Sequence, residues 1–168
     1  MILIFFGLPA TGKTYLSEKA AKEFDAAHLN TDIIRKKINL QGKYDEQSKQ
    51  IVYDHMLQEM ASQVNKNQLV IVDGTFQKEM HRKQYLKKAK ELKQELYFIE
   101  MRAKEETVSE RMKSDRKHSE ADFNVYQNIK RSFEYMSEPH LILWTDVFTV
   151  TELINKIKLY INGKRTDH

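Results

Sequence analysis

One eight-residue segment constrains this chain more than any other feature. Residues 7–14 match the pattern G-x-x-x-x-G-K-[ST] at every fixed position, between an apolar run, Ile2–Phe6, and a helix-period segment, Lys13–Phe24. In such a strand–loop–helix setting, successive backbone N–H groups and the helix N-terminus face a bound anion. The setting favours a phosphate-binding loop over a glycine turn without function. The residues predicted to form this loop are Gly7, Leu8, Pro9, Ala10, Thr11, Gly12, Lys13 and Thr14.

Each fixed position of the loop has a chemical reason. Gly7 lets the chain leave the strand, and Gly12 lets the backbone wrap closely around phosphate oxygens. Lys13 would reach the β- and γ-phosphates of a nucleotide, and the Thr14 hydroxyl would ligate Mg²⁺. We therefore predict ATP and Mg²⁺ as the cofactors.

A second apolar run ends in a carboxylate. Leu69–Val72 is typical of a central strand, and Asp73 follows it directly. The carboxyl ends of parallel strands lie on one edge of a sheet, so Asp73 would lie beside the phosphate loop and orient Mg²⁺, directly or through water. Alternatively, Asp73 only begins the turn Asp73-Gly74. We predict Thr14 and Asp73 as the metal-binding pair.

Apolar runs of strand length alternate with helix-period segments, which is typical of βαβ units that build a parallel sheet. The predicted strands are Ile2–Phe6, Ala27–Asn30, Leu69–Val72, Leu96–Met101 and Leu141–Leu143. The predicted helices are Lys13–Phe24, Ile33–Asn39, Gln47–Asn65, Lys78–Lys93, Glu105–Asp115, a stripe from Phe123 to Met136 that Pro139 closes, and a last helix with a capping box at Thr149 and Glu152 and a stop at Gly163. We expect an α/β fold of three layers, the P-loop NTPase fold, with a central parallel sheet of about five strands, flanking helices and a small lid.

Length and composition exclude several classes of protein. The 168 residues suffice for one domain, expected over residues 1–168. The absence of cysteine excludes a disulfide framework and a thiolate metal site, and it suits a cytoplasmic location. The opening apolar run, Met1–Phe6, is too short for a signal peptide or a membrane span, so we expect no membrane partner.

The chain also lacks the marks of two other nucleotide-binding classes. A switch GTPase needs a guanine-reading Asn-Lys-x-Asp motif, whereas the near match at residues 65–68 lacks the aspartate and precedes the Asp73 strand. A ring-forming motor needs a longer core and a helical lid domain. The class that fits is the small kinases, in which an arginine-bearing lid closes over ATP.

Three further segments follow the phosphate loop in a recognisable order: residues 30–35 (Asn-Thr-Asp-Ile-Ile-Arg), residues 72–76 (Val-Asp-Gly-Thr-Phe) with Arg82, and Arg111 and Arg116 before residues 119–121 (Ser-Glu-Ala). In this combination the chain resembles the small kinases called AAA-type or zeta-toxin-like, and it is similar to the kinase domain of polynucleotide kinase. The resemblance extends from Ile2 to about Met136.

The resemblance implies a role for each matching residue. Asp32 would be the general base that accepts the proton of the acceptor hydroxyl, with Lys13 and Arg116 as the other catalytic residues. Arg111, which would contact the nucleotide, and Arg116 would belong to a lid at about residues 111–121 and stabilise charge in the transition state. The residues implied to bind the acceptor are Asp32, Arg35, Thr75 and Arg82.

Each of these roles has a simpler alternative. Asp32 is also a suitable N-cap for the helix Ile33–Asn39. Arg35 belongs to a run of three basic residues that would be solvated, and Arg82 lies in a lysine-rich helix. Arg111 would alternatively pair with Glu106 or Glu110.

The acceptor is the least constrained part of the prediction. We expect transfer of the γ-phosphoryl group of ATP to a hydroxyl of a small molecule, nucleoside or nucleotide. The net charge of +4 and the basic segment Lys78–Lys93 leave a nucleic-acid partner open, so a polynucleotide 5′-hydroxyl kinase is the alternative. A further alternative is an ATP-binding regulatory module with little turnover. Asp32 and Arg35 argue against this module, because a mere binder needs no base at the acceptor position.

Overall fold

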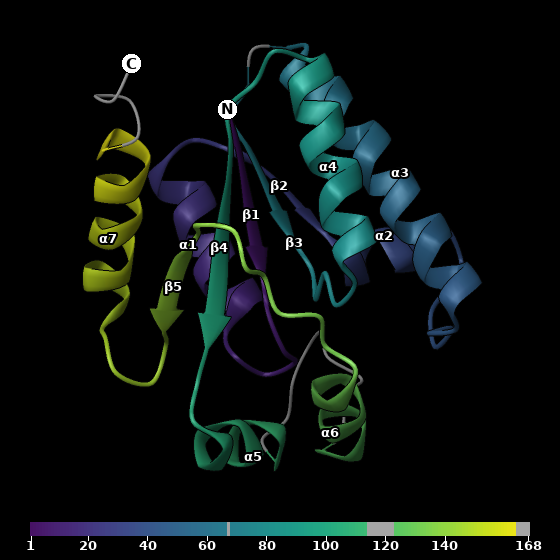
Figure 1. Ribbon diagram of the computed structural model, residues 1–168, viewed down its shortest axis with the longest axis vertical. Helices are drawn as coiled ribbons and strands as arrows, with labels where there is room; N and C mark the ends of the chain where they lie inside the picture. Colours follow the sequence, from purple (N-terminus) through teal and green to yellow (C-terminus); the bar gives the residue numbers. More distant parts are fainter. Residues whose placement is uncertain (67, 114–122, 164–168) are drawn as a thin grey trace.

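Five parallel strands form the central sheet of the computed structural model, which describes residues 1–66, 68–113 and 123–163 (Figure 1). The strands lie in the order β2-β3-β1-β4-β5. Every neighbouring pair is parallel, so the carboxyl ends of all strands meet at one edge. The strands are β1 (Ile2–Phe6), β2 (Ala27–Asn30), β3 (Val70–Asp73), β4 (Leu96–Arg102) and β5 (Leu141–Trp144).

Helices cover both faces of the sheet and its carboxyl edge. One face packs against α1 (Lys13–Glu23) and α7 (Val150–Gly163), and the other against α3 (Glu46–Val64) and α4 (Glu79–Glu91). Figure 1 shows α5 (Glu105–Lys113) and α6 (Phe123–Arg131) beyond the arrowheads of the strands. The short helix α2 (Thr31–Lys37) directly follows β2 and packs against α3.

The core explains why the strands read as continuous apolar runs. Every side chain of β1 is fully buried, because both faces of the sheet are covered. Ile2, Ile4 and Phe6 join the cluster under α3 and α4, whereas Leu3 and Phe5 join the cluster under α1 and α7. The predicted three-layer α/β fold with a five-stranded parallel sheet is therefore confirmed.

The first turn of α2 differs from the prediction. The helix begins at Thr31, not Ile33, and its N-cap is Asn30. The Oδ1 atom of Asn30 accepts hydrogen bonds from the backbone N–H groups of Asp32 and Ile33, at 2.8 and 3.1 Å. Asp32 lies inside the first turn, so the alternative that it caps the helix is wrong.

The end of α6 also differs from the prediction, because the helix stops at Arg131 and not near Pro139. The Ser132 hydroxyl donates back to the carbonyl of Asn128 at 2.9 Å, and the chain then continues without helix as a strap, residues 132–140. The N–H of Glu134 donates to the carbonyl of Gln77 at 3.0 Å, which holds the strap against the start of α4. Phe133 and Met136 of the strap still pack against the core, so their spacing imitated a longer helix.

The two ends of α7 agree with the prediction. The Thr149 N–H donates to Oε2 of Glu152 at 2.8 Å, and the Glu152 N–H donates to the Thr149 hydroxyl at 3.4 Å. These bonds form a capping box, and Gly163 is the last residue of the helix. Across residues 1–66, 68–113 and 123–163, no helix combines the length and apolarity needed to span a bilayer.

The fold predicts that Gly7 tolerates no side chain. Its φ is +136°, and a Cβ placed there would lie 2.5 Å from the carbonyl oxygen of Met101 on the neighbouring strand. Gly42 has a φ of +72° with nothing within 4 Å of an added Cβ, which makes it a matched control. We expect Gly42→Ala to lower the free energy of unfolding by about 1–2 kcal/mol, from backbone strain alone. Gly7→Ala should lower it by clearly more, measured by urea denaturation; equal losses would contradict the close approach.

Candidate active site

The phosphate loop connects β1 to α1 and orders its own side chains. The Lys13 ammonium donates to the carbonyl of Leu8 at 2.7 Å, and the Thr11 hydroxyl donates to the same oxygen at 2.8 Å. Gly12, at a φ of 90°, occupies the N-cap of α1 and offers no side chain to its first N–H groups. The first turn of α1 contains no acidic residue, so its positive end is available to an anion.

A buried carboxylate lies behind the loop. Asp73 is the last residue of β3, and its Oδ2 accepts a hydrogen bond from the Asn30 side chain at 2.6 Å and one from the Ser17 hydroxyl at 3.3 Å. The Asn30 amide also donates to the Thr14 hydroxyl at 3.2 Å. Asp73 is thus part of a strand and of a side-chain network, which argues against a role as a simple turn residue.

His28 completes this network from β2. Its Nε2 lies 3.0 Å from the Ser17 hydroxyl and 3.8 Å from Oδ2 of Asp73. Burial lowers the pKa of His28, although the nearby Asp73 carboxylate acts in the opposite direction. The lowered pKa favours the neutral imidazole near neutral pH.

The oxygen atoms of this network fit Mg²⁺. Within the described parts of the chain, the buried Oδ1 of Asp73 has no hydrogen-bond partner. The other oxygen of the same carboxylate is fixed by Asn30, whose amide also contacts the Thr14 hydroxyl. A carboxylate and a hydroxyl are hard oxygen ligands of the kind that Mg²⁺ prefers. Thr14 and Asp73 are therefore the residues that would hold the metal.

A cavity of about 850 Å³ opens over the loop at the carboxyl edge of the sheet. On the side of β5, which we call the loop side, it is lined by Gly12, Lys13, Thr14, Arg111, Thr145 and Phe148. On the side of β2, which we call the far side, it is lined by Asp32, Arg35, Tyr44, Glu46, Lys49, Tyr53, Lys78 and His81. Thr75 and three residues of α6, Val125, Asn128 and Ile129, also line the cavity. One cavity thus joins the phosphate loop to three of the predicted acceptor residues, Asp32, Arg35 and Thr75.

Arg35 lies inside this cavity and not in solvent. Its exposed fraction is 6%, its guanidinium donates to the Lys43 carbonyl, and it lies 4.5 Å over the ring of Tyr44. The alternative that Arg35 is a solvated surface residue is therefore wrong. Lys36 and Lys37 of the same run are exposed, because only Arg35 lies on the inner face of α2.

Arg82 requires a correction, because its contacts are structural. It is 3% exposed and donates to the backbone carbonyls of Phe76 at 2.6 Å and Glu134 at 2.5 Å. It thereby joins the turn after β3 to the strap, and it does not line the cavity. The predicted contact with the acceptor has no support in this position. Thr75, in contrast, lines the cavity, and its carbonyl accepts from the Gly7 N–H at 3.3 Å.

Arg111 lies directly beside the phosphate loop. Its guanidinium donates to the Ala10 carbonyl at 3.2 Å and to the Thr145 hydroxyl at 2.9 Å. The guanidinium thus lies beside the loop, as the predicted contact to a nucleotide requires. Arg116, and the predicted lid beyond Lys113, lie outside the described residues.

Thr145 is a site residue that the sequence did not reveal. Its hydroxyl donates to the Thr11 carbonyl at 2.7 Å and accepts from Arg111, while its N–H donates to the Arg102 carbonyl at 2.9 Å. It therefore joins the loop, α5 and the end of β4. The one available signal was its position after the last strand, at the edge where ligands bind in open parallel sheets.

Comparisons with known proteins concern the family and the fold of this chain. A family model described as an AAA domain matches residues 2–136. A sugar kinase from Janibacter sp. HTCC2649 is 15% identical, with a TM-score of 0.76 and coverage of 96% of this chain and 94% of that chain. A gluconokinase from Sinorhizobium meliloti 1021 is also 15% identical, with a TM-score of 0.74 and coverage of 99% and 97%.

An APS kinase from Mycobacterium tuberculosis, solved with AMPPNP and APS, is 12% identical, with a TM-score of 0.74 and coverage of 96% of each chain. A search of curated proteins finds no match. At these identities the likeness concerns the fold, and it agrees with the predicted P-loop NTPase fold.

The contacts of Thr145 lead to a prediction about nucleotide binding. Thr145→Val keeps the branched shape but removes the hydroxyl, so Arg111 and the loop lose their common partner. Loss of a hydrogen bond to a charged group corresponds to a weakening of ATP affinity by about tenfold or more. Titration calorimetry measures this, with Thr145→Ser expected to restore binding. The control is Thr107→Val, because the Thr107 hydroxyl donates to Asp146 at 3.4 Å and Thr107 does not line the cavity. Unchanged ATP affinity in Thr145→Val would refute the role.

Proposed function

The chain belongs to the AAA domain family, and from this premise we propose that it is an ATP-dependent kinase. The γ-phosphoryl group would pass to a hydroxyl of a small molecule, nucleoside or nucleotide. The observation that carries the proposal is the cavity itself, in which Asp32 on the far side faces the same space as Lys13 and Thr14 on the loop side. An ATP-binding module without turnover would need no carboxylate in that place.

The residues of the loop side would bind and orient ATP. Lys13 would exchange the Leu8 carbonyl for phosphate oxygens, and the N-terminus of α1 would face the same anion. Arg111 would bring a further positive charge beside the loop. Mg²⁺, when bound to Thr14 and Asp73, supplies charge that neutralises the β- and γ-phosphates.

Asp32 would act as the general base. The acceptor hydroxyl oxygen forms the new bond to the γ-phosphorus while the bond to the bridging oxygen of ADP breaks, and Asp32 takes the hydroxyl proton. Its position is set by the helix that Asn30 caps, so the carboxylate is carried by a rigid element. Arg116, in a lid at about residues 111–121, would stabilise the transition-state charge. We extend the proposal to one kinase domain over residues 1–168 that acts in the cytoplasm.

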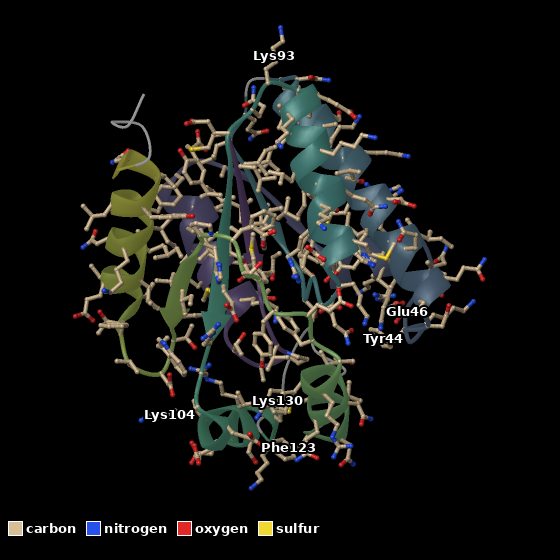
Figure 2. All side chains as sticks on the ribbon, viewed as in Figure 1. Tyr44, Glu46, Lys93, Lys104, Phe123 and Lys130 are labelled. Carbon is tan, nitrogen blue, oxygen red and sulfur yellow. The ribbon has the colours of Figure 1, made fainter. Side chains whose placement is uncertain are left out.

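The basic helix was the reason to consider a polynucleotide acceptor. Lys78 lines the cavity, whereas the other lysines of the segment do not. Two of these form ion pairs on the helix itself: Lys83 with Glu79 at 2.8 Å, and Lys88 with Glu91 at 3.0 Å. Figure 2 shows Lys93, beyond the end of α4, at the opposite end of the molecule from Tyr44 and Glu46. This arrangement supports a small acceptor over a polynucleotide 5′-hydroxyl.

The first test concerns phosphoryl transfer from labelled ATP to a panel of hydroxyl compounds. General-base catalysis typically contributes about 10²–10⁴-fold, so Asp32→Asn should lower kcat by that order. ATP affinity should change little, because Asp32 contacts the acceptor. Asp54→Asn replaces an exposed aspartate of α3 and is the matched control. A kcat that survives in Asp32→Asn would remove Asp32 from the mechanism.

The second test concerns Lys13. Lys13→Ala removes the mobile charge that would meet the β- and γ-phosphates, so both ATP binding and transfer should be lost while the thermal unfolding midpoint is retained. Lys19→Ala, on the exposed face of the same helix, serves as the control. Wild-type turnover in Lys13→Ala would overturn the kinase assignment.

A further inference from the structure

The far side of the cavity contains an anion-binding subsite that the proposed reaction does not use. We propose that Lys49 and Lys78 hold a carboxylate, sulfate or phosphate group of the acceptor, so that the acceptor is a small hydroxylated anion. The inference rests on the proposed function, because it names the class of the second substrate in the same cavity.

The two lysines come from different elements and converge on one wall. Lys49 lies in the first turn of α3, and Lys78 is the N-cap residue of α4. Both line the cavity. Glu46 links them: it pairs with Lys49 at 2.8 Å, and the charge of Lys78 also contributes to lowering the pKa of its carboxyl group. Both ammonium groups thus interact with the Glu46 carboxylate, which places them on the same part of the cavity wall.

The two lysines of the far side are paired with carboxylates that remain exposed to water. Glu46 pairs with Lys49 at 2.8 Å, and Glu134 of the strap pairs with Lys78 at 3.0 Å. The side chains of Glu46 and Glu134 are 69% and 48% exposed, so water screens both ion pairs and holds them weakly. An acceptor anion can therefore take the place of either carboxylate beside its lysine.

Two buried side chains with an unused nitrogen provide an independent observation. His81 is 3% exposed and lines the same wall, and its Nδ1 has no hydrogen-bond partner among the described residues. Arg35 is 6% exposed, and its Nε also has no hydrogen-bond partner among the described residues. Buried polar atoms normally have partners, so this wall has hydrogen-bonding capacity that the described residues leave open.

The His81 ring adds a second kind of contact. Its centroid lies 4.3 Å from that of Tyr53, and burial lowers the pKa of the imidazole. A neutral imidazole contributes one hydrogen bond without adding charge. Lys49 and Lys78 would therefore provide the charge, and His81 would orient the group between them.

The geometry places this subsite away from the phosphate loop. The loop side is built from α1, α5 and the end of β5, whereas Lys49 and Lys78 belong to α3 and the start of α4, which cover the opposite face of the sheet from α1. The anion would thus be bound at a separate position from the phosphates of ATP, in the same cavity that Asp32 of α2 lines. A hydroxyl compound with its charge at one end and its reacting hydroxyl at the other fits this arrangement.

The test uses matched pairs of compounds that differ only in charge: an aldonic acid and its alditol, a hydroxy acid and its amide, and a sugar phosphate and its free sugar. Transfer from labelled ATP gives kcat and KM, and calorimetry with a non-hydrolysable ATP analogue gives binding without turnover. The anionic member of a pair should show the higher kcat/KM. A charged hydrogen bond corresponds to about 10- to 100-fold in affinity, so Lys49→Gln should raise the KM of the anion by that factor.

The remaining readouts separate a binding role from a structural one. Lys49→Gln should leave the KM for ATP, the kcat, and the KM of any neutral compound near wild type, and Lys49→Arg should restore much of the affinity for the anion. Lys78→Gln should act in the same direction. Lys83→Gln, in the next turn of α4 but outside the cavity, is the matched control and should change nothing.

The outcomes distinguish the inference from the function on which it rests. Equal transfer to both members of each pair, unchanged by Lys49→Gln, overturns the subsite and leaves the kinase. Lys49-dependent binding of the anions without any transfer from ATP overturns the kinase and leaves the subsite. If neither transfer nor Lys49-dependent binding is observed, both the kinase and the subsite are overturned.

Discussion

A carboxylate enclosed by protein organises the whole carboxyl edge of the sheet. Asp73 is 1% exposed, and an uncompensated charge in such a place is costly. The chain offsets this with an amide from β2 and a hydroxyl from α1, both on the same oxygen. The other oxygen, Oδ1, has no hydrogen-bond partner among the described residues. Because Oδ2 of Asp73 is fixed by these bonds, β2, β3 and α1 take up defined positions around the other oxygen, Oδ1.

Asn30 connects the two halves of the site. Its amide nitrogen serves Asp73 and Thr14, while its amide oxygen caps the helix that carries Asp32. The positions of Thr14 and Asp73, which would hold the metal, and the position of the proposed base are therefore determined by one planar group. A change at Asn30 would disturb both at once.

Local sequence patterns were sufficient for the fold and for the phosphate loop. The strands are apolar on both faces because both faces are covered, and a run such as Ile2–Phe6 can hardly be read otherwise. Asp73 followed from the same logic, since it stands where a predicted strand ends, whereas the role of Asp32 came from the family resemblance. Apolar spacing misled only at the strap, where Phe133 packs into the core from an extended chain.

The other residues could not be predicted because their environment is made by segments far apart in sequence. Arg82 lies in a helix that is basic throughout. Only the three-dimensional structure shows that its guanidinium donates to the backbone carbonyls of Phe76 and Glu134. Lys49 and Lys78 lie in ordinary helix-start positions, and no pattern relates them. Thr145 acquires its partners from residues more than thirty positions away. Sequence therefore located the loop, whereas the wall opposite it became visible only in three dimensions.

The contacts of Lys13 and Arg111 have a consequence for selectivity. Each cation donates to a main-chain carbonyl of the loop, at 2.7 Å from Leu8 and 3.2 Å from Ala10. A ligand that enters must compete with these oxygens. A carbonyl oxygen already provides a hydrogen bond to the cation that is similar to one from an uncharged ligand oxygen. Only a group with full negative charge gains appreciably from the exchange. The loop would thus discriminate by charge: it would favour phosphate oxygens over uncharged oxygens, including the reacting hydroxyl of the acceptor.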